Sequence, residues 1–474
     1  MGATKNILLG KIRGGEPMSM RQQIKLASLL SYPAILAQFS SVIMQYIDTA
    51  MVGHLGAAAG ASIGLVSTCL WLFGGFGIAL CSGFSVQVAQ YIGARMNSSA
   101  RNVLRQGLLS CIIFSVALAI IGALISGRLP YWLGGTAEIA DNASKYFLIN
   151  ALFFPLMQLD WVSATMLQCS GNMKIPSILS IIMCVLDVIF NYIFIYALGM
   201  GVPGAALGTG LAEAVTALLM FYFLAVRSPE LSLTLEKGSY IPKKEVITKA
   251  TKISAPMFLE NIVMRGAHIA STIIVAPLGT IAIAANAFAI TAESLCYMPG
   301  YGIGDAATTL VGQSIGANRK KLANRFAWIT TGGGMVIMTA LSVLMFIFAP
   351  QMMGLLSPDP EVIALGAKVL RIEAFAETMY AASIVANGAC IGAGDTLIPS
   401  IMNFTSMWIV RIIPAAILTP KIGLVGFWIA MCVELNFRGI IFLLRLKGKK
   451  WMDKGIVTKD SEEMSSALLE GHGD

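Results

Sequence analysis

The chain has 474 residues, of which 56% are hydrophobic and only 12% charged, about half the charged share of an ordinary soluble domain. These proportions exclude a soluble globular protein, because a soluble core could not bury so much apolar surface. The formal net charge of +8 gathers in short segments beside apolar stretches, which argues against a nucleic-acid partner and for a lipid bilayer.

Twelve apolar stretches follow one another, each long enough to cross a bilayer as a helix. The predicted spans are 29–53, 61–91, 103–127, 144–168, 175–199, 203–226, 250–276, 283–313, 326–350, 364–391, 397–419 and 421–445. Helices satisfy every backbone N–H and C=O group in lipid, and the stretches lack the alternation typical of barrel strands. We therefore expect an all-α integral membrane protein with 12 transmembrane helices.

Basic residues in the connecting segments predict the orientation of these spans. With twelve spans, one side receives nearly all of them: Lys5 to Lys25 before the first span, Arg95 to Arg105, Lys174, Lys237 to Lys252, Arg319 to Arg325, and Lys447 to Lys450. The other side receives only Arg128, Lys145 and Lys421. By the positive-inside rule, we expect both termini in the cytoplasm. The protein is then a multi-pass protein of the plasma or inner membrane.

The sequence repeats itself at an offset of 223 residues. Matching pairs are Pro33 with Pro256, Leu55-Gly56 with Leu278-Gly279, Ile92-Gly93-Ala94 with Ile315-Gly316-Ala317, and Ile175-Pro176-Ser177 with Ile398-Pro399-Ser400. Two halves of six spans each enter the membrane from the same side, so the repeat is parallel, with a pseudo-twofold axis along the membrane normal. We predict a cytoplasmic segment 1–28, an N-terminal lobe 29–226, a cytoplasmic linker 227–249, a C-terminal lobe 250–445 and a cytoplasmic tail 446–474.

Motifs for catalysis or nucleotide use are missing from the sequence, which has no nucleophile elbow, P-loop or metal-ligand pattern. We expect no enzyme and no cofactor, and no soluble stretch is long enough for an ATP-binding domain. An ion gradient is the remaining energy source, which favours a secondary transporter. A membrane-embedded enzyme and a passive channel are the alternatives from other classes.

Ionisable and polar residues within the first six spans are candidates for a cation site, because charge inside a bilayer persists where it pairs, binds ions or lines water. Asp187 and Asn191 are four residues apart and share one helical face, and carboxylate and amide oxygens suit a hard cation. Asp48 lies in the first span, and Thr209 could add a hydroxyl. The competing interpretations are an interface carboxylate, a chance polar pair and a threonine bonded to its own helix.

The second half carries a different set of polar residues. Glu260 lies in the seventh span near Arg265, and Glu377 shares a predicted helical face with Glu373 in the tenth. Arg411 stands alone in the eleventh span. The simpler interpretation is a structural ion pair between one of these arginines and a glutamate.

An ordered set of motifs covers residues 25–450. They are Asp48-Thr49-Ala50-Met51-Val52-Gly53-His54-Leu55-Gly56, Gly171 to Ser177, Gly204-Ala205-Ala206 with Thr209, Val311-Gly312-Gln313-Ser314-Ile315-Gly316-Ala317, Gly392-Ala393-Gly394-Asp395-Thr396, and Trp408 to Arg411. With this set the chain resembles the multidrug and toxic compound extrusion (MATE) transporters. The resemblance implies two six-helix lobes, alternating access, and export of cationic or aromatic compounds in exchange for Na⁺ or H⁺, with no required protein partner.

The resemblance also assigns roles to particular residues. Asp48 matches the acidic residue of the family's N-lobe cation site, and Glu260 matches the glutamate of the seventh span in sodium-coupled members. The fifth span usually has asparagine first and aspartate four residues later, whereas here Asp187 precedes Asn191. The family's acidic position in the tenth span does not align cleanly with Glu377.

Two questions stay open at the level of sequence. The clustered oxygen ligands favour Na⁺ slightly over H⁺, since a proton needs only one carboxylate. The alternative function is a flippase for lipid-linked saccharide precursors of a related fold. That function predicts a strongly cationic cavity, and arginines within the spans are few.

Overall fold

The computed structural model describes residues 2–457, and in this range the chain is helical, with no strand. Backbone contacts divide it into two compact units. One unit is Phe39–Phe258, and the other combines the residues up to Gln38 with those from Leu259 onward. We call them the N-terminal unit and the C-terminal unit. Both divisions fall within a long helix, α2 (Met20–Gly53) and α9 (Lys244–Val275), so each of these helices contributes to both units.

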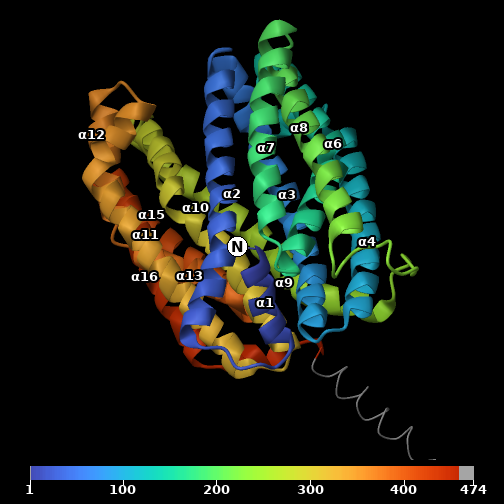
Figure 1. Cartoon of the computed structure of the whole chain (residues 1–474). Helices are drawn as coiled ribbons and strands as arrows, with labels where there is room; N and C mark the ends of the chain where they lie inside the picture. Colours follow the sequence, from blue (N-terminus) through green and yellow to red (C-terminus); the bar gives the residue numbers. More distant parts are fainter. Residues whose placement is uncertain (1, 458–474) are drawn as a thin grey trace, which may run out of the picture. The chain divides into compact units, whose positions relative to one another are not determined.

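The N-terminal unit is a helical bundle built around α6, which packs against α3, α4 and α8 (Figure 1). Side chains such as Val66 and Phe147 are fully buried between these helices, as expected for packing within a membrane bundle. Its remaining elements are α3 (Ala57–Gly93), α4 (Asn97–Ile125), α5 (Leu129–Trp132), α6 (Ala137–Cys169), α7 (Lys174–Asn191), the π-helix η1 (Tyr192–Ala197), α8 (Val202–Tyr222) and the π-helix η2 (Phe223–Arg227).

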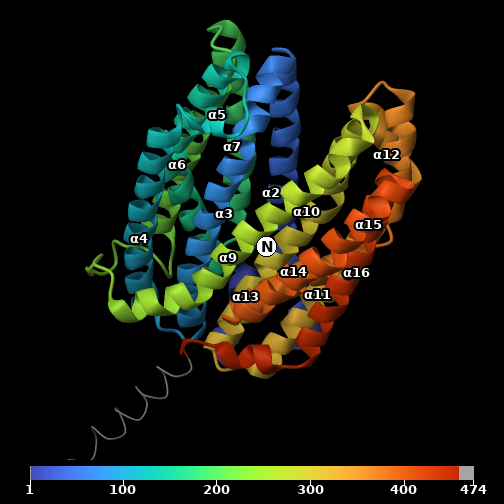
Figure 2. The same ribbon diagram turned by 180° about the vertical axis from the view of Figure 1, so that it is seen from behind.

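The C-terminal unit is a second bundle in which α10 packs against α11 and α13, and α13 against α16 (Figure 2). A short helix that the sequence did not predict, α1 (Gly2–Arg13), packs against α10. The other elements are η3 (Ala276–Leu278), α10 (Thr280–Gly316), α11 (Lys320–Leu356), α12 (Pro360–Glu373), α13 (Glu377–Gly392), α14 (Leu397–Thr405), the π-helix η4 (Ser406–Ile412), α15 (Ile413–Ile422), α16 (Leu424–Lys447) and η5 (Lys450–Lys454).

The sequence repeat is also present in the backbone. Helices α3 and α10 are both 37 residues long. Backbone angles at matching positions agree as well: φ is +102° at Gly56 and +89° at Gly279, and it is +61° at Arg95 and +56° at Asn318. The predicted fold class, an all-α membrane protein of two pseudo-symmetric halves, is confirmed.

Eleven helices in the described range are long and apolar enough to cross a membrane. The predicted span 364–391 is not among them, because it is divided into α12 and α13. The division is marked by a tight turn in which the N–H of Ala376 donates to the carbonyl of Glu373 at 2.7 Å. The two pieces together provide the twelfth crossing.

Several helices are longer than the spans predicted for them. Helices α2 and α9 begin at Met20 and Lys244, ahead of the predicted starts at residues 29 and 250, because hydropathy marks only the part of a helix that lies in lipid. The predicted limits of lobes, linker and termini stay a prediction. Residues 458–474 of the predicted tail lie outside the described residues.

Candidate functional site

Three of the predicted cation ligands meet in the N-terminal unit. Asp187 and Asn191 lie one turn apart on the inner face of α7, and Asp48 approaches them from α2. The Nδ2 group of Asn191 donates to Oδ1 of Asp48 at 2.9 Å and to Oδ2 of Asp187 at 3.1 Å. One amide therefore bridges two carboxylates, and we call these three residues the Asp48 cluster.

The Asp48 cluster is half-buried at Asp48, fully buried at the two residues of α7, and keeps unused acceptors. Asp187 is 0% exposed and Asn191 is 1% exposed. Oδ1 of Asp187 and Oδ1 of Asn191 have no hydrogen-bond partner among the described residues. Because two neighbouring carboxylates in a low-dielectric site repel each other unless a proton or a cation lies between them, this oxygen-rich arrangement suits a bound cation.

Helix α8 closes the cluster with a glycine. A Cβ atom at Gly208 would lie 2.1 Å from Oδ1 of Asn191 and 2.8 Å from its backbone nitrogen, so only glycine lets α8 approach α7 this closely. The π-helix η1 begins at the residue after Asn191, and π-helical turns are frequent at functional sites. Thr209 follows Gly208, but its hydroxyl makes no hydrogen bond to the cluster within the described range, and its role as a ligand stays a prediction.

Two further acids in the same unit were left without a role by the sequence. Glu213 on α8 is 5% exposed and lies within electrostatic reach of Asp160 and Asp187. Oδ1 of Asp160, on α6, is buried without a hydrogen-bond partner among the described residues. Both acids lie within predicted spans, and this could have marked them as candidates. The sequence could not show that Glu213 on α8 lies near acids on other helices.

In the C-terminal unit, Glu260 is held by neutral donors from α14. Its Oε2 accepts from the hydroxyl of Ser400 at 2.6 Å, and its Oε1 accepts from Nδ2 of Asn403 at 2.6 Å. A carboxylate held by neutral groups keeps its negative charge available to a cationic ligand.

Glu377 and Glu373 flank the interruption between α12 and α13. Both are 0% exposed, and all four of their carboxyl oxygens lack a hydrogen-bond partner among the described residues. Glu293 on α10 lies within electrostatic reach of both. The prediction that Glu373 and Glu377 share the face of one continuous helix is wrong, because the helix breaks between them. Interrupted membrane helices often build binding sites.

An ion-pair network in the same unit involves Arg411 of η4. Its Nη1 lies 3.9 Å from Oε2 of Glu434 on α16, whose Oε1 is 2.6 Å from Nη2 of Arg438. Glu434 also accepts from the hydroxyl of Ser406. The sequence singled out Arg411 but gave Glu434 no role. Arg265 lies partly buried in α9, and its predicted ion pair stays a prediction.

Comparison with known proteins identifies the family to which the chain belongs. The MatE family model matches residues 33–193 and 256–417, one match in each repeat and more than half of the chain together. A probable multidrug resistance protein NorM of Thermotoga maritima is 27% identical over 457 residues, which cover 94% of this chain and 96% of that one. The multidrug resistance protein MdtK of Yersinia pestis is 24% identical over 438 residues, covering 90% and 94%.

Solved structures share the fold. A MOP superfamily transporter from Pyrococcus furiosus superposes with a TM-score of 0.86 at 21% identity, over 93% of this chain and 98% of that one. A mutant of the MATE transporter VcmN of Vibrio cholerae gives 0.85 at 18% identity, over 90% and 97%. Two family matches at the spacing of the internal repeat, on a twelve-crossing helical fold, lead to one conclusion: this chain belongs to the MatE family of membrane transporters and is not an enzyme.

Proposed function

We propose that this protein is a secondary active antiporter that exports cationic or aromatic drugs or metabolites in exchange for Na⁺ or H⁺, by alternating access. The proposal places it in the plasma or inner membrane with both termini in the cytoplasm. The names of the relatives, multidrug resistance proteins, support drugs as substrates. The observation that carries the coupling is the Asp48 cluster.

The Asp48 cluster supports a cation as the coupling ion. Its two carboxylates and one amide oxygen are hard ligands from two helices, and two of these oxygens are buried without another partner among the described residues. Several oxygens converging on one place suit Na⁺ better than H⁺, so we favour Na⁺ slightly. The exchanged order of Asp187 and Asn191 does not prevent the amide from bridging both acids.

The C-terminal unit supports a separate role in substrate recognition or coupling. Glu260 is held by two neutral donors, so its charge is available to an organic cation. Glu377 is buried beside other acids at the interrupted helix and is the second candidate. We assign both to the polar site of the C-terminal lobe.

The flippase alternative receives less support from the described spans. It needs a cationic cavity within the spans, but the guanidinium groups of the half-buried Arg411 and the buried Arg438 are both paired with Glu434.

The test is ethidium efflux from proteoliposomes that contain the full chain. A Na⁺ gradient and a pH gradient are imposed separately on the wild type, on Asp48→Asn and on Asp141→Asn. Asp141 is the matched control, because its side chain is 70% exposed in a surface pair with Lys145, and such pairs contribute little.

We expect efflux that requires one gradient, is lost in Asp48→Asn and is retained in Asp141→Asn. The gradient that drives efflux identifies the coupling ion. Equal flux with and without gradients would identify a channel, and full gradient-driven efflux in Asp48→Asn would remove the Asp48 cluster from the coupling mechanism.

A further inference from the structure

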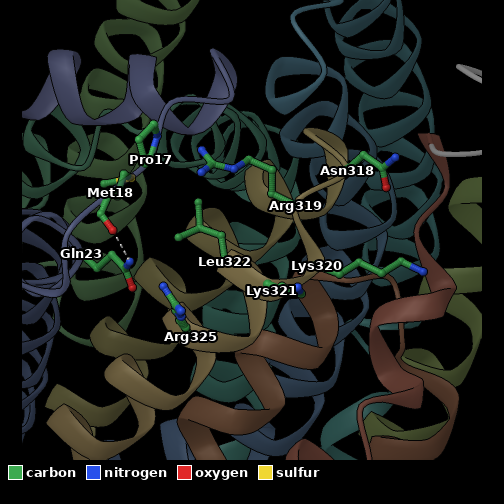
Figure 3. A pocket seen from close by; sticks show the side chains of 9 residues that line it. All are labelled: Pro17, Met18, Gln23, Asn318, Arg319, Lys320, Lys321, Leu322 and Arg325. Carbon is green, nitrogen blue, oxygen red and sulfur yellow. Dashed lines mark hydrogen bonds between the residues drawn. The ribbon is translucent and has the colours of Figure 1, made fainter.

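A basic pocket lies in the C-terminal unit and shares no residue with the polar sites described above. It has a volume of about 540 Å³ and lies between the start of α2 and the start of α11 (Figure 3). None of the described residues that line it is acidic, and four are basic: Arg319, Lys320, Lys321 and Arg325. Such a pocket attracts an anion.

The basic side chains of the pocket are not all neutralised. Lys320 pairs with Asp453 at 2.7 Å. Arg319 donates to the backbone carbonyls of Lys11 and Glu16, each at 2.8 Å, which hold its position without cancelling its charge. Lys321 and Arg325 have no hydrogen-bond or ion-pair partner among the described residues. Three positive charges therefore remain for a ligand.

A buried acceptor in the pocket wall, Oε1 of Gln23, further limits which ligands would fit. Gln23 is 1% exposed, and its Nε2 donates to the carbonyl of Met18 at 2.8 Å (Figure 3). Its Oε1 has no hydrogen-bond partner among the described residues. An unpaired buried acceptor is costly, so the ligand that fits best brings a hydroxyl donor as well as an anionic group.

The outer face of α11 continues from the pocket in a way that suits a lipid. Lys321, Arg325, Trp328 and Val336 are exposed on one stripe of this helix. Along the stripe the residues change from basic to aromatic to aliphatic. This is the order found from headgroup level to the hydrocarbon region, with tryptophan at the interface.

We propose that this pocket binds an anionic phospholipid with a hydroxyl-bearing headgroup, of the phosphatidylglycerol type, in the leaflet level with the starts of α2 and α11. The phosphate contacts Lys321, Arg325 and Arg319, a headgroup hydroxyl donates to Oε1 of Gln23, and the acyl chains follow the stripe past Trp328. The lipid thereby joins the segment after α1 to the start of α11. Basic pockets beside membrane helices are suited to such headgroups.

Native mass spectrometry of the full chain in detergent tests this site, with phosphatidylglycerol, phosphatidylethanol and phosphatidylcholine as probes. Phosphatidylethanol keeps the phosphodiester charge but lacks the headgroup hydroxyl. The test variant is Lys321→Gln with Arg325→Gln. The matched control is Lys244→Gln with Lys252→Gln, which removes two charges from exposed residues of α9.

We expect phosphatidylglycerol to bind the test variant about thirtyfold more weakly than the wild type, since each basic residue near a membrane surface contributes about 1 kcal/mol. The control should bind like the wild type. Phosphatidylethanol should bind the wild type about two- to tenfold more weakly than phosphatidylglycerol, the value of one hydrogen bond, and Gln23→Leu should abolish this preference.

Three results would overturn the proposal. The first is equal phosphatidylglycerol affinity in the test and control variants. The second is no preference of the wild type for phosphatidylglycerol over phosphatidylcholine. The third is displacement of the lipid by equimolar glycerol phosphate, which would assign the pocket to a soluble phosphate compound.

Discussion

The substitution Gly208→Ala tests whether the close approach of α7 and α8 builds the cation site. The added methyl would lie 2.1 Å from Oδ1 of Asn191, 2.8 Å from its backbone nitrogen and 3.0 Å from its Cα. Two of these atoms are backbone, so a rotamer change cannot remove the clash. The helices must separate, and Asn191 must leave its position between the two carboxylates.

The free energies of two effects of this substitution, on helix packing and on ion binding, can be approximated. Overpacking a tight interface costs about 1–3 kcal/mol, although alanine alone favours a helix over glycine by about 1 kcal/mol. The second effect is on ion binding. A ligand at a hundred times its dissociation constant stabilises a protein by about 2.7 kcal/mol, and a displaced Asn191 should remove most of this stabilisation.

The assay is thermal unfolding of the purified protein with and without saturating Na⁺, at constant ionic strength set with choline chloride. We expect Gly208→Ala to unfold at a lower temperature and to gain little from Na⁺. Gly60→Ala is the control, because a Cβ at Gly60 meets no atom within 4 Å and alanine should be neutral or stabilising there. Wild-type stability together with a full response to Na⁺ in Gly208→Ala would refute the reasoning.

Three further substitutions test other contacts. Glu434→Gln should destabilise the protein by about 3–5 kcal/mol, because it leaves Arg438 buried without its anionic partner; chemical denaturation measures this, and a loss below about 1 kcal/mol would contradict it. Glu260→Gln should raise the KM for ethidium efflux by at least about tenfold with little change in stability, whereas an unchanged KM would exclude a contact with the substrate. The hydrogen bond from Arg101 holds the pKa of Glu236, in the linker, below its usual value. The stabilisation is therefore present above the usual value of about 4.3 and lost as the pH falls through the folded-state pKa. Protection factors of the linker amides, which correct for the intrinsic pH dependence of hydrogen exchange, should therefore fall in acid in the wild type but not in Glu236→Gln.

The fold could be predicted from sequence because a bilayer leaves few structures available. Hydropathy located the spans, and the 223-residue repeat predicted two matching halves. The break between Glu373 and Glu377 could not be predicted, because their spacing fits a continuous helix and the intervening residues are neither proline nor glycine. Packing of the surrounding helices, which hydropathy does not describe, determines such a break.

The candidate site was predictable to different degrees. The pair of Asp187 and Asn191 followed from helical spacing, and Asp48 followed from its place as an acidic residue within a predicted span; the family resemblance then assigned its role. Gly208 and Glu434 were given no role, because each acts through a side chain on another helix. Contacts of this kind depend on how helices pack against one another, and the spacing of residues along one helix contains no information about them.

The internal repeat reproduces the scaffold without reproducing its chemistry. At the offset of 223 residues, Asp48, Asp187 and Asn191 correspond to Ser271, Val410 and Pro414. Neither carboxylate nor the amide has a counterpart, although turns at matching positions share their backbone angles. The C-terminal unit therefore cannot supply a second copy of the Asp48 cluster. If the proposed antiport is correct, Asp48→Asn should abolish coupled efflux rather than halve it, and a residual rate near half of the wild-type value would show that the second unit contains an independent coupling site.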